Sequence, residues 1–221
     1  MDFQPTEEQA MLVDSLRRYL TTAYPFEERR RVARQQRGFE RRHWQALADL
    51  GILGLTVPVD AGGFGETAAT QLLVHRELGR ALLAEPVIPS AVMASAVLTA
   101  WAGADIQAAW LPTLADGSRI VSVAWQETGS RYSPARTTTT VTEAADGLVL
   151  DGSKCLVWHG GVADAFLVLA QAQAGFGLVL VPRDHSGVDI TDYPTLDGSR
   201  AADIRFHRVR LPVSAWAVAP P

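Results

Sequence analysis

The hydrophobic and polar positions follow two different periods along the chain. Up to about residue 117, apolar side chains recur at every third or fourth position, which is the spacing of one buried face of an α-helix. Between about residues 120 and 210, apolar and polar side chains alternate, as in half-buried β-strands. This change predicts an α+β fold with an all-α N-terminal domain, residues 1–118, followed by a β domain, residues 119–221.

Six helices are expected in the first domain. The first begins at Thr6, because Thr6-Glu7-Glu8-Gln9 has the form of a capping box in which Thr6 and Gln9 each satisfy an end amide. The other helices are expected over residues 26–38, 44–51, 67–83, 91–101 and 106–117. Pro86 and Pro89 are expected to end the helix predicted over residues 67–83. Glycines make residues 51–65 a loop.

Seven strands are expected in the second domain. They cover residues 120–126, 137–143, 148–157, 165–170, 177–181, 188–193 and 202–209. Turn pairs such as Asp146-Gly147 and Asp197-Gly198 separate them. Short strands at this spacing predict an antiparallel β-sandwich or barrel.

Composition narrows the class of protein. Of the 221 residues, 48% are hydrophobic and 20% are charged, which is typical of a globular chain. The net charge of −4 gives no reason to expect nucleic acid as a partner. Neither a membrane helix nor a signal peptide is indicated, so a cytoplasmic location is expected. The single cysteine, Cys155, excludes an internal disulfide.

Seven arginines fall between Arg29 and Arg42. They could contact phosphates, or they could form a solvated helix face that pairs with nearby glutamates. The acidic charge of the whole chain favours the solvated face, with Glu27, Glu28 and Glu40 as partners.

Most other polar residues point to no particular chemistry. The five histidines show no ligand spacing, so no metal site is expected. Gly62-Gly63-Phe64-Gly65 lacks the lysine of a phosphate loop, and Cys155 is expected to be a buried, inert thiol. Trp158-His159-Gly160-Gly161 is different, because two rings precede a glycine pair at a strand end. These rings could stack on a planar ligand, or they could simply pack.

The order of the motifs resembles that of the acyl-CoA dehydrogenase family. In the first domain the resemblance rests on four segments: Met1-Asp2-Phe3 with the capping box, Trp44 through Gly65, Glu77-Leu78-Gly79-Arg80 with Pro86, and Trp110 through Gly117. In the second domain it rests on Glu127-Thr128-Gly129-Ser130, similar to a flavin loop, and on Asp146 through Lys154. Lys154, the only lysine among the 20 basic residues, stands where the family pattern has lysine.

Two further segments resemble a subgroup of the family. Arg131-Tyr132, and Tyr193 through Ala202, are similar to the smaller subunits of heteromeric dehydrogenases of the pimeloyl-CoA or steroid side-chain type. Such a resemblance implies FAD as cofactor and an acyl-CoA substrate. It also implies a homo- or hetero-oligomer with a second acyl-CoA dehydrogenase subunit, and electron-transfer flavoprotein as a further partner.

The resemblance also implies roles for particular residues. Those matching flavin-contacting segments are Trp125, Gln126, Gly129, Ser130, Val157, Trp158 and His159. Ser130 and Arg131 are expected near the substrate. Three positions depart from the family pattern: Gln126 replaces a threonine, Leu156 a tryptophan, and Trp158 a threonine near the flavin.

In this family a carboxylate removes the α-proton while the β-hydrogen leaves as hydride to the flavin. That carboxylate belongs to a C-terminal four-helix bundle, which is expected to be missing from the 221 residues. No catalytic residue is therefore nominated in this chain, and Glu127 is expected to be structural. Two hypotheses follow: a part of a fuller or heteromeric FAD-dependent enzyme, or a non-catalytic partner subunit that does not itself bind flavin.

Overall fold

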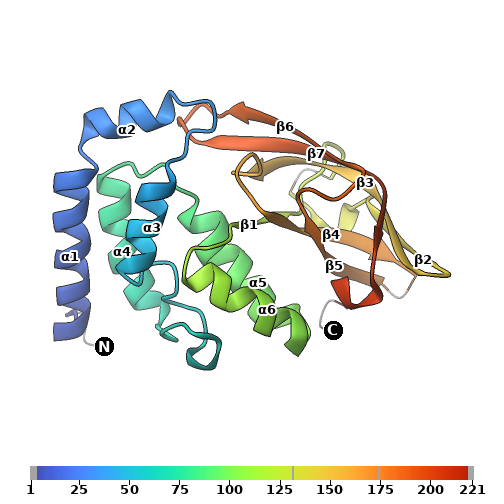
Figure 1. Cartoon of the computed structure of the whole chain (residues 1–221), viewed down its shortest axis with the longest axis horizontal. Coiled ribbons are helices and arrows are strands. Elements are labelled where there is room, and N and C mark those ends of the chain that lie inside the picture. The colour runs from blue at the N-terminus through green and yellow to red at the C-terminus, as the bar shows by residue number, and fades with distance from the viewer. Residues whose placement is uncertain (1–3, 131, 174, 219–221) are drawn as a thin grey trace.

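A computed structural model describes residues 4–130, 132–173 and 175–218 and places a helical half beside a β half (Figure 1). The helical half contains α1 (Glu7–Ala23), α2 (Phe26–Ala33), α3 (Arg41–Asp49), η1 (Val59–Ala61), α4 (Ala68–Arg80), η2 (Val87–Ala94), α5 (Ser95–Trp101) and α6 (Ala104–Ala115). A helical half followed by a β half is the order that the two periods predicted.

Helix α1 begins as its sequence predicts. The hydroxyl of Thr6 accepts a hydrogen bond from the backbone amide of Gln9 at 3.2 Å, and the Gln9 side chain accepts one from the Thr6 amide at 3.0 Å. Both halves of the capping box are therefore present. The buried face of α1 packs along α4, where Arg17 forms an ion pair with the buried Glu77 at 3.1 Å.

The segment after α4 differs from the prediction. The helix expected at residue 91 starts earlier, because η2 forms a π-helix over Val87–Ala94 and continues into α5. Pro89, which we expected to end a segment, lies inside the first turn of η2. The first turn of a helix tolerates proline, since its amide would have no partner within the helix.

The β half forms one eight-stranded sheet within the described residues. Its strands are β1 (Val121–Ala124), β2 (Thr140–Ala144), β3 (Gly147–Trp158), β4 (Ala165–Ala172), β5 (Gly175–Pro182), β6 (Val188–Pro194), β7 (Arg200–Leu211) and β8 (Trp216–Val218). The order is β6-β7-β3-β2-β4-β5-β8, and β1 pairs with β4. Two short 3-10 turns, η3 (Pro134–Arg136) and η4 (Val213–Ala215), lie between strands.

Most of these pairings are antiparallel, as predicted, but the sheet is mixed. Strand β1 runs parallel to β4, with Val121 opposite Ala165. Parallel neighbours need a crossover between them, and here the crossover is the chain that carries the β2–β3 hairpin. The β1–β4 pairing therefore brings the segment after β1 beside the end of β3.

Two hydrophobic clusters of the described residues each contain side chains from both halves. Buried side chains of the helices, such as Trp44, belong to the same cluster as Val168 and Ile204 of the sheet. Hydrogen bonds also join the halves: the Val121 amide donates to Ser90 Oγ at 3.1 Å. Helix α2 reaches the β6–β7 turn, where Arg29 donates to the carbonyl of Asp197 at 3.3 Å (Figure 1).

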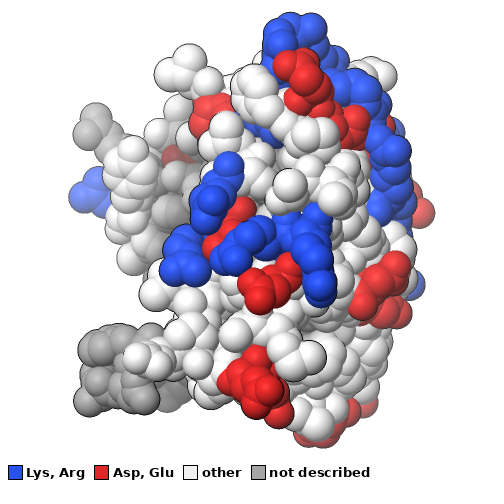
Figure 2. All heavy atoms as spheres, turned by 90° about the vertical axis from the view of Figure 1, so that its left-hand side faces the viewer, with Lys and Arg blue, Asp and Glu red and all other residues white. Residues whose placement is uncertain are grey.

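The arginine-rich stretch forms ion pairs on the surface. Arg31 bonds to Glu28 at 2.7 Å and to Glu40 at 2.8 Å, and Arg42 bonds to Glu28 at 2.5 Å. Figure 2 shows basic and acidic side chains interleaved over the helical side of the molecule. The solvated, paired face predicted from the sequence is confirmed.

The described residues contain neither a membrane-spanning helix nor a group of metal ligands. No helix among them is long and apolar enough to cross a membrane. Within the same residues, no three histidine, cysteine, aspartate or glutamate side chains are grouped so that they could hold a metal ion.

The capping box gives a test of the fold. Thr6→Ala is expected to lower the free energy of unfolding by about 1 kcal/mol, because the Gln9 amide loses its acceptor at the helix end. Chemical denaturation would measure this change. Thr22→Ala, in the last turns of the same helix, serves as the control and should change stability by less. Equal effects of the two substitutions would contradict the capping role.

Candidate functional site

The loop that follows β1 is organised around the buried carboxylate of Glu127. Three consecutive threonines surround it, all donating through their hydroxyls: Thr137 at short range, Thr138 at 2.6 Å and Thr139 at 2.7 Å. The backbone amides of Thr138 and Thr139 donate as well, at 2.7 and 3.0 Å. Residues 137–139 were expected to begin a strand. Instead β2 begins at Thr140, because these residues bind Glu127.

The fourth partner of Glu127 is Lys154 of β3. Its Nζ lies 2.7 Å from Glu127 Oε1 and 2.8 Å from Thr137 Oγ1, and the lysine side chain is fully buried. Burial opposes ionisation of Glu127, but Lys154 and the threonine donors outweigh it and hold the pKa of Glu127 below its usual range. Burial lowers the pKa of Lys154, and Glu127 offsets part of that change. The only lysine of the chain is thus a structural anchor.

This anchor holds the two expected flavin segments side by side. The backbone amide of Cys155 donates to the Gln126 carbonyl at 2.9 Å, next to Lys154. The Ser122 hydroxyl donates to the carbonyl of Trp158 at 2.9 Å. Trp125 and Gln126 are both half-buried. The loop after β1 and the end of β3 therefore form one continuous surface.

Residues at the far end of the loop are less available to a ligand. Ser130 is buried, and its hydroxyl closes a turn by accepting from the Glu127 amide and donating to the Glu127 carbonyl, both at 3.1 Å. Gly129 is exposed, with open space where a side chain would stand. Arg131 lies outside the described residues, so its expected place near the substrate stays a prediction.

The end of β3 is irregular and turns an aromatic ring outward. A bulge separates Lys154 from Val157 in the pairing with β7, and Leu156 has a φ of 51°, which is uncommon for a residue with a side chain. Val157 is buried, whereas the side chains of Leu156 and Trp158 are 45% and 50% exposed. Of the expected flavin-contacting side chains in β3, Trp158 is the one most available to a ligand.

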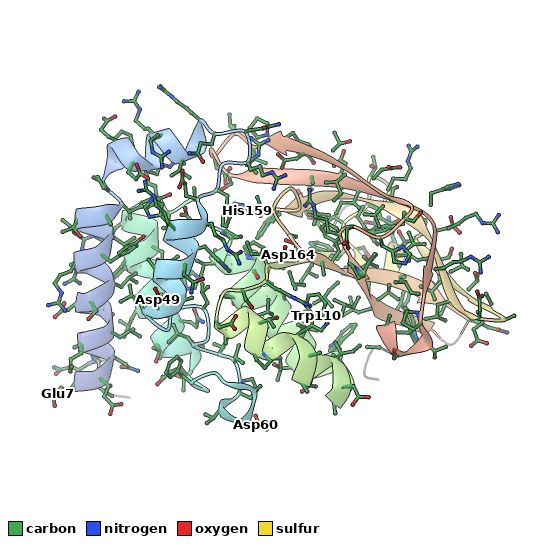
Figure 3. The ribbon with its side chains drawn as sticks, in the orientation of Figure 1. Glu7, Asp49, Asp60, Trp110, His159 and Asp164 are labelled. Carbon is green, nitrogen blue, oxygen red and sulfur yellow. The ribbon has the colours of Figure 1, made fainter. Side chains whose placement is uncertain are left out.

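His159 follows Trp158 at the boundary between helices and sheet (Figure 3). It has a φ of 52°, and its amide donates to the carbonyl of Arg200 at 2.9 Å. The ring is buried, and its Nδ1 has no hydrogen-bond partner among the described residues. Burial lowers the pKa of His159 to about 4, so the imidazole is neutral at physiological pH.

Trp158 and His159 form part of a pocket of about 710 Å³ between the two halves. Its helical wall is mainly apolar and comes from the end of α4 and the start of η2. The opposite wall comes from the end of β3 and the β6–β7 turn. The lining includes Leu78, Leu82, Leu83, Val87, Ile88 and Leu196. A mainly apolar cleft with a few polar groups is typical of a small-molecule site.

Glu85 is the unusual residue in this pocket. It is 5% exposed, and neither of its carboxylate oxygens has a hydrogen-bond partner within the part of the chain that the structure describes. Burial raises its pKa to about 7. The Tyr24 hydroxyl offsets part of this effect, although the two groups do not form a hydrogen bond of normal geometry.

Neither Glu85 nor the role of Thr137–Thr139 was predicted from the sequence. The only local signal for Glu85 is a charged residue within the apolar stretch from Leu82 to Ile88. Thr137–Thr139 carry no signal, because β-branched residues are expected in strands.

The buried ion pair gives a second prediction. Lys154→Met is expected to reduce the free energy of unfolding by about 3–5 kcal/mol, because Glu127 keeps its burial but loses the compensating charge. Arg210→Met removes the exposed Arg210–Asp146 pair and should change stability little. Denaturant unfolding of both variants tests this difference. A small loss of stability in Lys154→Met would show that the threonine donors alone stabilise the buried carboxylate of Glu127.

Glu85 gives a third prediction, on the pH dependence of stability. Since its pKa is raised from 4.5 to about 7, the folded state keeps a proton that the unfolded state has released. Its contribution is complete below pH 4.5 and is lost as the pH rises through 7. Relative to Glu85→Gln, the wild type should lose on the order of 3 kcal/mol over this range.

Thermal or denaturant unfolding at several pH values would measure this loss. Glu7→Gln removes an exposed carboxylate of α1 and is the control, whose pH profile should follow that of the wild type. Parallel profiles for the wild type and Glu85→Gln would refute the raised pKa.

Comparison with known proteins places this geometry in a family. The model of the N-terminal domain of acyl-CoA dehydrogenases matches residues 6–118, and that of the middle domain matches residues 122–209. Acyl-CoA dehydrogenase FadE27 of Mycobacterium tuberculosis is 33% identical over 199 residues, which are 88% of this chain and 51% of that protein. The chain thus spans about half the length of this relative.

Solved structures of similar fold include two heteromeric assemblies. The ChsE4-ChsE5 complex from Mycobacterium tuberculosis matches with a TM-score of 0.87 and 28% identity, over 98% of this chain and 58% of that one. The Tcur3481-Tcur3483 steroid ACAD matches with a TM-score of 0.86 and 26% identity, over 99% of this chain and 59% of that one. On these family matches and this identity, the chain belongs to the acyl-CoA dehydrogenase family.

Proposed function

We propose that this chain contributes domains 1–118 and 119–221 to a FAD-dependent acyl-CoA dehydrogenase, as part of a fuller or heteromeric enzyme. The observation that carries the proposal is the joining of the loop after β1 to β3, whose end lines the interdomain pocket. The Cys155–Gln126 hydrogen bond makes this junction, and the Glu127–Lys154 pair supports it. Of the two expected flavin segments, the one at the end of β3 reaches a cleft large enough for an acyl group, through Trp158 and His159.

The residues at this junction suit a flavin in three respects. Trp158 offers a half-exposed ring to a planar partner. His159 follows it in a left-handed backbone conformation that ends the strand, and Gly129 leaves open space in the loop. FAD, when bound, would supply the acceptor for the hydride that leaves the acyl chain. The contribution of this chain is to form an apolar wall, to exclude water and to hold backbone groups in place.

No acidic residue of the site is proposed as the base that takes the α-proton. Glu127 is fully engaged by Lys154 and the threonines, which keep it ionised and immobile. The oxygens of Glu85 are covered, so they cannot reach the α-carbon of a bound thioester. We therefore propose that another part of the assembled enzyme supplies the base. The similarity to the ChsE4-ChsE5 and Tcur3481-Tcur3483 assemblies supports a second acyl-CoA dehydrogenase subunit as its source.

A second candidate function is that of a partner subunit that does not itself bind flavin. The observations that favour it are local. Trp158 places a large indole at the strand end, and the Ser130 hydroxyl is used within its own turn. Such a subunit would shape the site of its partner without holding the cofactor.

Co-purification distinguishes the two functions. The chain is expressed alone and together with a candidate partner subunit of the acyl-CoA dehydrogenase family, and flavin absorbance and acyl-CoA-dependent dye reduction are recorded. The chain alone is expected to reduce no dye, because it lacks the base. The complex is expected to be yellow, with flavin at this chain's site as well as at the partner's.

The variant Trp158→Ala locates the flavin. It should lower the flavin content of the complex to about half if the ring stacks on the cofactor, since one of two sites is lost. Phe26→Ala removes an exposed aromatic ring of α2 and should leave the flavin content unchanged. A complex in which this chain's site stays colourless would support the non-binding partner instead.

A further inference from the structure

The interdomain pocket has an unusual balance of charge. Two carboxylate side chains line it, those of Glu85 and Asp197, and hydrogen bonds from Thr195 and Ser199 lower the pKa of Asp197 and keep it ionised. The one arginine in the lining is Arg200. A ligand that enters therefore meets more acidic than basic groups.

Arg200 carries a charge that is already paired with an acidic side chain. Its guanidinium is bound to Asp192, with Nε 2.8 Å from Oδ2 and a second, shorter contact to the same oxygen. The remaining oxygen of Asp192, Oδ1, is buried and has no partner within the described ranges. Asp192 thus has acceptor capacity to spare, and a ligand carboxylate would have to compete with it for Arg200.

One of the two histidines of the pocket is neutral. Burial lowers the pKa of His159 to about 4. His75, on α4, places Nδ1 2.9 Å from the carbonyl of Gln71. No lysine is among the described residues of the lining, and its one arginine is already paired with Asp192.

Resting on the proposed function, we propose that this pocket selects an uncharged, mainly apolar acyl group and rejects an acyl group that ends in a second carboxylate, with Glu85 as the specificity-determining residue. Both substrate classes are compatible with the sequence resemblance, so this choice comes from the structure. A carboxylate entering the pocket would lose its hydration. The guanidinium nearest to the pocket rim, that of Arg29, is not part of the lining and is directed to the carbonyls of Leu82 and Asp197. The entering carboxylate would also approach a second, buried carboxylate, and such like-charge juxtaposition is costly at low dielectric.

The repulsion between a ligand carboxylate and Glu85 does not require contact with the Glu85 oxygens. Glu85 is a lining residue whose oxygens are covered and have no hydrogen-bond partner within the described residues, so few polar groups screen their field. With a pKa of about 7, most Glu85 is ionised at pH 8, which is the pH for the experiment.

Binding of two matched thioesters tests the proposal. Octanoyl-CoA and suberyl-CoA have acyl chains of the same length, and the second carries a terminal carboxylate. Their dissociation constants are measured by titration calorimetry on the co-purified complex after its flavin has been reduced with dithionite, so that no hydride transfer follows binding. Octanoyl-CoA is expected to bind at least about tenfold more tightly to the wild type. Glu85→Gln should reduce this preference to about threefold or less, and Glu7→Gln, on an exposed turn of α1, should preserve it.

A gain-of-binding variant covers the case in which Glu85→Gln fails to fold. Ile88 lines the pocket and is 47% exposed, so Ile88→Arg would add a cation at the mouth without disturbing the core. It is expected to strengthen binding of suberyl-CoA about tenfold, whereas Val59→Arg, on η1 outside the pocket, should not.

The outcomes separate this inference from the proposed function. Equal binding of both thioesters, or tighter binding of suberyl-CoA to the wild type, would overturn the selectivity and leave the proposed function standing. Failure of the complex to bind either thioester would overturn both. A preference for octanoyl-CoA that Glu85→Gln leaves intact would remove Glu85 from the role.

Discussion

The buried ion pair between Lys154 and Glu127 is the interaction on which the rest of the site depends. It links the middle of β3 to the loop after β1, two segments that the crossover brings together from distant parts of the β half. A buried pair of charges is stable only when its remaining hydrogen-bonding capacity is satisfied. Thr137, Thr138 and Thr139 meet that need, and the cost is that the start of β2 is delayed to Thr140.

From this anchor the geometry of the candidate site follows step by step. Fixing Lys154 places Cys155 against Gln126, and the bulge that follows reverses the usual alternation so that Trp158 is exposed while Val157 is buried. His159 then ends the strand in a left-handed conformation with its ring enclosed. Strain of this kind persists where the surrounding structure over-determines it, and it is common at binding sites.

The interdomain pocket illustrates how burial changes the chemistry of ordinary residues. Burial favours the neutral form of both Glu85 and His159, raising the pKa of the first to about 7 and lowering that of the second to about 4. Arg200 is neutralised in another way, by a paired aspartate. The pocket consequently carries fewer charges than the five titratable side chains of its lining would suggest. This charge balance belongs to a chain that is similar in fold to subunits of heteromeric dehydrogenases.

Much of the architecture was determined locally by the sequence. The capping box at Thr6 and the two periods of hydrophobic side chains predicted α1 and the helical-then-β order, because these features depend on neighbours a few residues away. The motif around Lys154 also indicated the family, because it is a run of residues that are close together in the sequence. Side chains of the arginine-rich stretch pair with glutamates that lie close in sequence, so that pattern was predictable as well.

Only the tertiary structure decided the features that depend on distant partners. The parallel pairing of β1 with β4, the binding of Glu127 by three threonines and the enclosure of Glu85 all join residues far apart in the chain. Pro89 could enter a helix because η2 begins two residues before it, which no propensity indicates. The sequence by itself determined which elements form, since that depends on local periodicity. Which charges are buried and paired was decided by the fold, because desolvation depends on everything packed around a group.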